Sequence, residues 1–299
     1  MADPTGSSPA DRVAGGYAQL EERAAAWASN EPAVRAVIVL GSRARTDHPA
    51  DEWADLDIVL IVSDDEPLIG DRNWVAQIGE PWIDFVERTA GGEARELRVL
   101  FAGGFDVDFA LLTVPAVEHM LEHDPNAGIT AFGRGHRVLL DKDGLAEHVL
   151  GAVAKAIMEP TDRTPSAHDL RELCADFWYH TVWTAKHLRR GELWWAKGCC
   201  DGLLKELLRR MLEWEAVAKE RDAWFRGRFL EEWADPDTVA GLRTAFAHYD
   251  EAETWVALER TMDLFAEATH RVTDLLDEPY PEAMERHARE LVAEIQTRR

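Results

Sequence analysis

The stretch Val37–Val62 constrains the fold more than any other part of this 299-residue chain. It begins and ends with apolar runs, Val37–Leu40 and Ile58–Val62, which have the length and composition of buried strands. Between them lies a polar segment that opens with Gly41-Ser42-Arg43 and closes with Asp55-Leu56-Asp57. The sequence therefore predicts two buried strands, joined by a polar segment with a small-residue turn at one end and two carboxylates at the other.

The two carboxylates and the turn have complementary chemistry. Residues i and i+2 of a strand project from one face, so Asp55 and Asp57 are expected to point the same way. Adjacent carboxylates repel unless a cation lies between them, and their oxygens are ligands that magnesium prefers. A glycine after a strand, as at Gly41-Ser42, lets backbone amides approach phosphate oxygens. Each motif alone is common in proteins without such a site, but the combination indicates a nucleotide-triphosphate site.

This arrangement also carries a family resemblance. An apolar residue, Gly-Ser, a spacer and Asp-apolar-Asp-apolar resembles the signature of the polymerase-beta-like nucleotidyltransferases. Gly41, Ser42, Asp55 and Asp57 fill its positions, with Arg43–Ala54 as the spacer. The resemblance implies the fold and the metal-dependent chemistry of that superfamily.

A further acidic strand, Asp106–Leu112, supplies a candidate for a third carboxylate. Nucleotidyl transfer by two magnesium ions needs a carboxylate that binds a metal or removes the proton of the acceptor. Asp108 has an apolar residue on either side and is the candidate for this role, whereas Asp106 follows a Gly-Gly turn and is more simply a turn residue. A solvated hairpin aspartate is the alternative for Asp108.

Composition and charge restrict the partners. The formal net charge is −23, and a surface this acidic repels phosphate backbones and attracts cations, so we expect no nucleic-acid partner. The three cysteines make a disulfide framework improbable and favour a reducing compartment. The first residues lack the pattern of a signal peptide, and no run of about 18 apolar residues exists. We therefore expect a cytoplasmic protein that does not enter a membrane.

Residue patterns divide the chain in two. Strand and helix signals alternate up to about residue 158, and Met158–Pro165 has the composition of a linker. Beyond it, helical spacing dominates and strand signals are nearly absent. We predict an α/β (α+β) fold: a disordered N-terminus (1–10), a nucleotidyltransferase domain with a mixed sheet flanked by helices (11–160), and a C-terminal helical bundle that binds substrate (161–299).

The resemblance extends to one family, because the sequence is similar to the aminoglycoside 6-adenylyltransferases, which modify streptomycin. The matching pieces run in order over most of the chain. They are GSRA at Gly41–Ala44, DEWADLDI at Asp51–Ile58, VSDDEP at Val62–Pro67, NWVAQIG at Asn73–Gly79, VDFALL at Val107–Leu112, PSA at Pro165–Ala167, DFW at Asp176–Trp178, KELLRRMLEW at Lys205–Trp214 and YPE at Tyr280–Glu282.

This resemblance implies a reaction: transfer of AMP from ATP to a hydroxyl of an aminoglycoside, with streptomycin at its 6-position as the expected acceptor. Pyrophosphate is released, and the modified antibiotic is inactive, which confers resistance. By the same match, Asp55, Asp57 and Asp108 hold two magnesium ions, and Asp108 can also activate the hydroxyl. Gly41, Ser42 and Arg43 would contact the triphosphate; the alternative for Arg43 is a surface salt bridge.

The helical half offers three further candidates. Lys186 lies on the first long helix and could reach the β- and γ-phosphates, although exposed lysines are common. Asp176 and Trp178 lie earlier on that helix and could offer a carboxylate and an aromatic wall to a polycationic sugar. A place in the helical core is an equal alternative for Trp178.

Two other functions stay open. A nucleotidyltransferase of the same fold could act on another small molecule or on a protein side chain. A non-catalytic nucleotide-binding relative is the third possibility, and the intact set of Asp55, Asp57 and Asp108 argues against it. We expect a monomer.

Overall fold

The computed structural model describes residues 9–89, 94–123, 125–158 and 164–297. The chain divides into two compact units, Met1–Thr161 and Asp162–Arg299. The division lies next to the domain boundary that we expected near residue 160. The assignment of each unit as an independent domain stays a prediction. Most of the N-terminal segment expected to be disordered, residues 1–8, lies outside the described residues, and the first helix begins at Pro9.

The first unit is built on a six-stranded sheet in the order β3-β4-β5-β2-β1-β6. The pair β2–β5 is parallel and the other neighbouring pairs are antiparallel, which confirms the predicted mixed sheet. The strands are β1 (Val34–Leu40), β2 (Leu56–Val62), β3 (Pro81–Arg88), β4 (Arg95–Phe101), β5 (Phe105–Thr113) and β6 (His136–Asp141).

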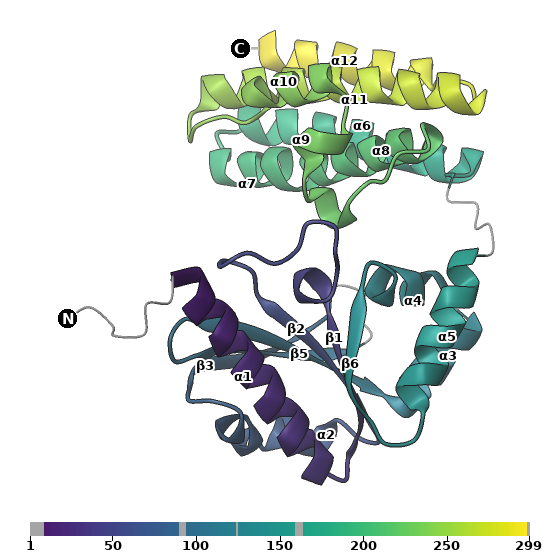
Figure 1. Ribbon diagram of the computed structural model, residues 1–299. Helices are drawn as coiled ribbons and strands as arrows, with labels where there is room; N and C mark the ends of the chain where they lie inside the picture. Colours follow the sequence, from purple (N-terminus) through teal and green to yellow (C-terminus); the bar gives the residue numbers. More distant parts are fainter. Residues whose placement is uncertain (1–8, 90–93, 124, 159–163, 298–299) are drawn as a thin grey trace. The chain divides into compact units, whose positions relative to one another are not determined.

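Helices cover both faces of this sheet (Figure 1). On one face, α1 (Pro9–Asn30), α2 (Glu66–Gly70) and the 3-10 turn η2 (Asn73–Gln77) close a core in which Trp27 stacks on Trp74. On the other face lie α3 (Val114–His123), α4 (Pro125–Phe132) and α5 (Leu145–Met158). The short helix α4 was not predicted from the sequence.

The central strands are apolar on both sides because both faces are covered. Leu56, Ile58 and Leu60 of β2 belong to the core under α1, whereas Val59 and Ile61 belong to the core under α5. Since side chains alternate along a strand, Asp57 has the same parity as Val59 and Ile61. The two-sided burial explains the uninterrupted apolar run that marks this strand in the sequence.

The second unit is helical, and its described residues contain no strand, which confirms the predicted bundle. Ser166 caps the first long helix with a complete capping box to Asp169. The elements are α6 (Ala167–Arg189), α7 (Leu193–Gly198), η3 (Cys199–Leu203), α8 (Leu204–Ala218), η4 (Phe225–Gly227), α9 (Leu230–Trp233), α10 (Pro236–Ala245), α11 (Glu251–Leu276) and α12 (Glu282–Thr297). A π-helical turn, η3, separates α7 from α8.

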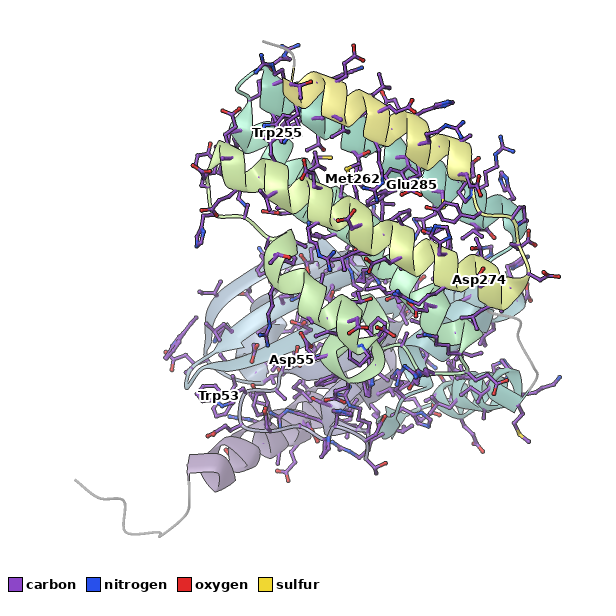
Figure 2. All side chains as sticks on the ribbon, turned by 90° about the horizontal axis from the view of Figure 1, so that it is seen from above. Trp53, Asp55, Trp255, Met262, Asp274 and Glu285 are labelled. Atoms are coloured by element: carbon purple, nitrogen blue, oxygen red, sulfur yellow. The ribbon has the colours of Figure 1, made fainter. Side chains whose placement is uncertain are left out.

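The helix α11 is central to the core of the second unit. Trp255 and Met262 are its labelled core residues in Figure 2, and Phe265 stacks on Phe177 of α6 with ring centroids 3.6 Å apart. Glu215 of α8 is 4% exposed at its side chain, and the guanidinium of Arg271 donates to it at 2.7 and 3.0 Å. None of the described helices has the length and apolar character needed to cross a membrane.

Candidate active site

Three carboxylates meet on one face of the sheet, where β2 and β5 begin. Asp55 precedes β2, Asp57 is the second residue of that strand, and Asp108 lies in β5. The parallel register pairs Asp57 with Asp108. One oxygen from each carboxylate lies within 4.8 Å of the others. The structure therefore brings together the three aspartates that the sequence singled out, and their functions stay predictions.

Gly41 shapes this carboxylate cluster from the neighbouring strand. It opens the 3-10 turn η1 (Gly41–Arg43) with a φ of +67°, a conformation that favours glycine. A Cβ atom at this position would lie 2.1 Å from Oδ2 of Asp57. Gly41 thus makes room for the Asp57 carboxylate, a role that sequence reasoning missed. The predicted approach of its backbone to phosphate stays a prediction.

Asp108 is the buried member of the cluster, with 8% of the residue exposed. Burial raises the pKa of Asp108 from 3.8 to about 7; Arg98 opposes this rise, and Glu96, Asp57 and Asp55 add to it. A cation among the three carboxylates would favour the ionised form of each of them. Carboxylates this close together, one of them buried, form a donor set suited to a hard divalent cation such as magnesium.

Two charged residues of β4 extend the cluster toward the edge of the sheet. The guanidinium of Arg98 lies beside Asp108, with Nη2 3.4 Å from Oδ2, and its Nε lies 2.6 Å from Oε1 of Glu87 on β3. Glu96, with a side chain 14% exposed, lies 3.7 Å from the same guanidinium. Burial is the largest cause of the raised pKa of Glu96, and Asp55 contributes to the rise.

Arg43 contacts the protein backbone with its guanidinium group. Its Nε donates to the carbonyl oxygen of Asp55 at 2.9 Å, and its Nη2 donates to that of Ala54 at 2.5 Å. The guanidinium carbon lies 3.5 Å from the ring centroid of Tyr17, whose hydroxyl donates to Asp106 at 2.9 Å. Arg43 therefore holds the segment that leads into the carboxylates. Its predicted contact with the triphosphate stays a prediction.

A basic cavity of about 390 Å³ lies beside η1. It is lined by the arginines at positions 43, 45 and 137 and by one acid, Glu21, which pairs with Arg137 at 2.8 Å. Ser42 also lines it; this residue is 8% exposed, and its Oγ has no hydrogen-bond partner among the described residues. An unpartnered buried hydroxyl beside three guanidinium groups is a ready donor for an anionic ligand.

In the second unit, Asp176 and Lys186 both have solvent access. Asp176 is half-buried, with Oδ1 2.7 Å from Nδ1 of His180, and it lines a cavity of about 550 Å³ together with Glu172, Tyr179 and Trp214, among others. Lys186 is exposed on the last turns of α6. The substrate and phosphate contacts expected for these two side chains stay predictions.

Trp178 lies in the core of the second unit. The residue is 3% exposed, its ring packs edge-on against Phe177 and Phe265, and the guanidinium of Arg289 lies 5.5 Å from the ring centroid. Trp178 therefore occupies a core position, which was one of the two alternatives for this residue. Contact between the Trp178 ring and the substrate stays a prediction, and this packing does not support it.

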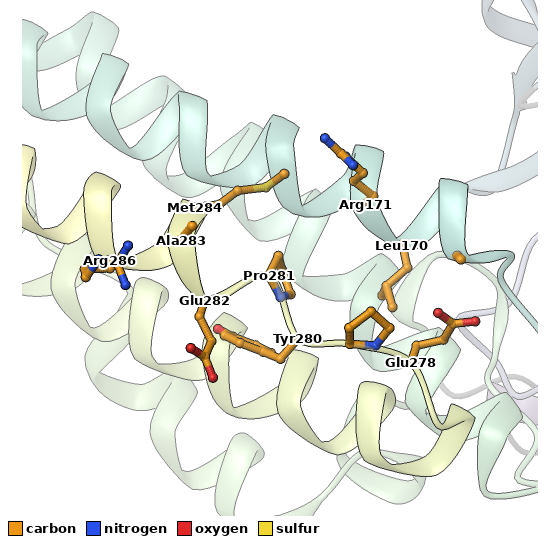
Figure 3. A pocket seen from close by; sticks show the side chains of 11 residues that line it. Leu170, Arg171, Glu278, Tyr280, Pro281, Glu282, Ala283, Met284 and Arg286 are labelled. Carbon is orange, nitrogen blue, oxygen red and sulfur yellow. The ribbon is translucent and has the colours of Figure 1, made fainter.

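A larger cavity of about 590 Å³ lies within the second unit, between the start of α6 and the segment that joins α11 to α12 (Figure 3). Tyr280, in the YPE piece of the sequence, lines it, stacks on His270, and donates a hydrogen bond to Glu285 at 2.6 Å. The contacts of Tyr280 fix the segment Glu278–Glu282 against the bundle.

Sequence reasoning missed four charged residues: Glu96 and Arg98 on β4, near the carboxylates, and Arg45 and Arg137, which line the basic cavity beside η1. Glu96 and Arg98 are two residues apart in β4, and this spacing places their charges on one face of the strand. The Gly103-Gly104 turn predicts that this strand and the strand of Asp108 form a hairpin, but the sequence does not show that Arg98 pairs with Asp108 across it. Arg137 belongs to β6, far along the chain from η1, and only the sheet order brings the two together.

Comparisons with known proteins agree with the motifs. The family model for streptomycin adenylyltransferase matches residues 17–295. An aminoglycoside 6-adenylyltransferase of Campylobacter jejuni is 24% identical over 265 residues, 85% of this chain and 87% of that protein. One from Bacillus subtilis (strain 168) is 23% identical over 270 residues, covering 86% and 89%.

Among solved structures, the crystal structure of an aminoglycoside 6-adenyltransferase from Bacillus subtilis is 18% identical, with a TM-score of 0.45 and coverage of 93% of this chain and 99% of that one. The family assignment rests on the sequence, because the family model spans most of the chain from Tyr17 onward. The chain belongs to the streptomycin adenylyltransferase family of nucleotidyltransferases, as its motifs predicted.

Proposed function

We propose that this protein transfers AMP from ATP to a hydroxyl of an aminoglycoside, with streptomycin at its 6-position as the first candidate, and releases pyrophosphate. The observation that carries the proposal is the cluster of Asp55, Asp57 and Asp108, whose oxygens lie within 4.8 Å of one another. In this proposal the protein acts as a monomer in the cytoplasm, and the transfer of AMP inactivates the antibiotic.

Magnesium suits this cluster, since hard oxygen ligands are those it prefers. Asp55, Asp57 and Asp108 would hold two ions. When bound, magnesium offsets the negative charge that develops on the transferred phosphoryl group and on the leaving group. The protein contributes ligands already close together: the parallel register pairs Asp57 with Asp108, and Gly41 leaves room for the Asp57 carboxylate.

The triphosphate tail of ATP fits the basic cavity beside η1. Three arginines against one glutamate give this cavity a positive charge, although the whole chain carries −23. The buried Ser42 hydroxyl would donate to a phosphate oxygen and so gain the partner it lacks in the protein alone. In this proposal Gly41 and Arg43 also line the tail, and Lys186 contacts the terminal phosphates.

The sheet order suggests the side from which the acceptor approaches. Attacking and leaving oxygens lie roughly in line across the transferred phosphorus. The basic cavity lies beside η1, which follows β1, and beside Arg137 of β6; both strands are on one side of β2, whereas β5 and β4 lie on the other side. We infer that the acceptor hydroxyl approaches from the side of β4. Its oxygen bonds to the α-phosphorus, the bond to the β-phosphate oxygen breaks, and Asp108 accepts the hydroxyl proton.

An acceptor that carries several positive charges suits this chain. Glu87 lies on the approach side within the first unit with its side chain 44% exposed, and exposed carboxylates attract cations over the range of the Debye length. In the second unit, the cavity beside Asp176 is lined by three carboxylates and two aromatic side chains against one cation, Arg210, and this excess of acids is favourable for ammonium and guanidinium groups. We assign Asp176 to the acceptor on this ground and leave Trp178 as a less supported candidate.

The test is an acceptor panel. Purified protein is incubated with ATP, magnesium and, one at a time, streptomycin, other aminoglycosides, neutral sugars and a protein extract, and products are followed by mass spectrometry. We expect the mass of streptomycin to increase by one AMP, and no increase with Asp57→Asn. Modification of only neutral sugars or proteins would replace the proposed acceptor, and no AMP transfer to any acceptor would refute the activity.

A further inference from the structure

Arg98 is the cation in contact with the buried carboxylate of the cluster. Its Nη2 lies 3.4 Å from Oδ2 of Asp108, and the two residues are register partners on β4 and β5. Asp108 is in turn the register partner of Asp57 on β2. The guanidinium and the two carboxylates therefore lie at one level of the sheet, on three adjacent strands.

Arg98 is itself held by acids on two strands. Its Nε lies 2.6 Å from Oε1 of Glu87 on β3, and its Nη2 lies 3.7 Å from Oε2 of Glu96 on β4. The Nε atom is buried and makes no hydrogen bond to the described residues. Its contact with Glu87 is therefore an ion pair without hydrogen-bond geometry. Because the guanidinium is anchored outside the cluster, its place beside Asp108 does not depend on Asp108 alone.

We infer that Arg98 is a positioning residue for Asp108. By pairing with Oδ2, it holds one oxygen of the carboxylate toward β4 and leaves the other for a metal ion shared with Asp55 and Asp57. It also offsets part of the repulsion among three carboxylates before any metal binds. Groups that orient metal ligands in this way change metal affinity or activity about 10–100-fold when they are removed.

The inference rests on the proposed function in one respect, which is that Asp108 is a metal ligand. A direct contact between Arg98 and the triphosphate is the rival role. The strand order argues against it, because the basic cavity lies beside η1 and Arg137 of β6, whereas Arg98 lies on β4, with β5, β2 and β1 between β4 and β6. A positioning role predicts a change in metal affinity, whereas a phosphate contact predicts a change in nucleotide affinity.

The experiment compares three variants with the wild type. Arg98→Gln removes the charge, and Arg98→Lys keeps the charge without the planar fork. Arg95→Gln is the matched control, because Arg95 lies on the same strand and pairs with Asp65 and Glu66 instead of the cluster. Manganese binding is measured by electron paramagnetic resonance with a non-hydrolysable ATP analogue, and analogue binding is measured separately without divalent metal.

We expect Arg98→Gln to raise the Kd for manganese about 10–100-fold. Arg98→Lys should raise it less and Arg95→Gln should leave it unchanged. The Kd of the analogue measured without metal should change less than about twofold in all three variants. In turnover assays, saturating magnesium should restore most of the kcat of Arg98→Gln without a change in the KM for ATP.

Unchanged manganese affinity in a folded Arg98→Gln variant would overturn the inference. So would a loss of analogue affinity with manganese binding intact, which would show a phosphate contact instead. Circular dichroism and melting temperature verify folding, and if Arg98→Gln does not fold, Arg98→Lys and Glu87→Gln decide by the same manganese titration. This titration needs no acceptor, so failure of the wild type to adenylylate any aminoglycoside would remove the proposed function and leave this test intact.

Discussion

Replacing Asp108 by asparagine should stabilise the first unit of the metal-free protein while abolishing AMP transfer. The residue is 8% exposed and lies near two other carboxylates. Its negative charge therefore costs folding free energy unless a cation compensates it, and asparagine fills nearly the same volume without the charge. A residue kept at the expense of stability indicates a role in function.

The size of the effect follows from the pKa of Asp108, which rises from 3.8 to about 7 on folding. The folded protein thus binds the proton more tightly than the unfolded chain, so stability is lost as pH rises from about 4 through about 7. At about 1.4 kcal/mol per pKa unit, the full loss is about 4 kcal/mol above that range, and about 2–3 kcal/mol of it falls between pH 5 and pH 8. The favourable contact with Arg98 is already included in this energy, because Arg98 opposes the rise in the pKa of Asp108.

The assay is urea unfolding of wild type and Asp108→Asn at pH 5 and pH 8 with a chelator present. Hydrogen exchange of the β2 and β5 amides reports the first unit directly, because the two units need not unfold together. Asp106→Asn is the matched control, since it removes one negative charge from an exposed residue of the same strand. Added magnesium should then stabilise the wild type more than Asp108→Asn.

The expected result is a stability gain for Asp108→Asn that is larger at pH 8 than at pH 5 by about 2–3 kcal/mol. A gain of equal size at both pH values would show that the charge of Asp108 is not penalised by the fold. A net destabilisation at pH 8 would show that the ion pair with Arg98 outweighs burial. Either result would refute the reasoning.

Three further predictions concern other parts of the molecule. Asp57→Asn should lower the rate of AMP transfer roughly 100-fold or more with an unchanged circular dichroism spectrum, and wild-type turnover would exclude a metal role for Asp57. Gly41→Val should raise the KM for ATP and lower the melting temperature, because it strains a φ of +67° and places Cβ against the Asp57 carboxylate; calorimetry that finds unaltered ATP binding would remove Gly41 from the site. Glu215→Ala should destabilise the second unit by about 3–5 kcal/mol in urea unfolding, because it leaves the guanidinium of Arg271 without its buried partner; a loss below about 1 kcal/mol would show that the pair is solvated.

The parts of the fold that sequence could predict are those with strong local signals. The apolar runs of β1 and β2, flanked by Gly41 and Asp57, are long enough to be recognised as buried strands. Strong local signals also mark the start of α6, which Ser166 caps, and the whole length of α11, because capping and helical spacing depend only on nearby residues. Helix α4 was missed because Pro125–Phe132 is short and includes a glycine and a threonine, which are poor helix formers.

The parts that could not be predicted depend on which individual residues the folded chain brings into contact. Arg43 follows Gly41-Ser42, and we predicted that it contacts phosphate. In the protein alone, its guanidinium donates to the carbonyl oxygens of Ala54 and Asp55, because the segment between them folds back onto it. Arg98 faces Asp108 only because β4 and β5 pair in one register. A shift of that register by one residue would turn Arg98 to the other face of the sheet.

The proposed AMP transfer is tested most directly by following each phosphate of ATP. Wild-type protein is incubated with magnesium, streptomycin and ATP labelled at either the α- or the γ-phosphorus, and the products are separated. We predict that streptomycin takes the α label and that the γ label leaves entirely in pyrophosphate, with no transfer by Asp57→Asn. Transfer of the γ label to streptomycin, or no labelled streptomycin although magnesium and ATP bind, would contradict the account.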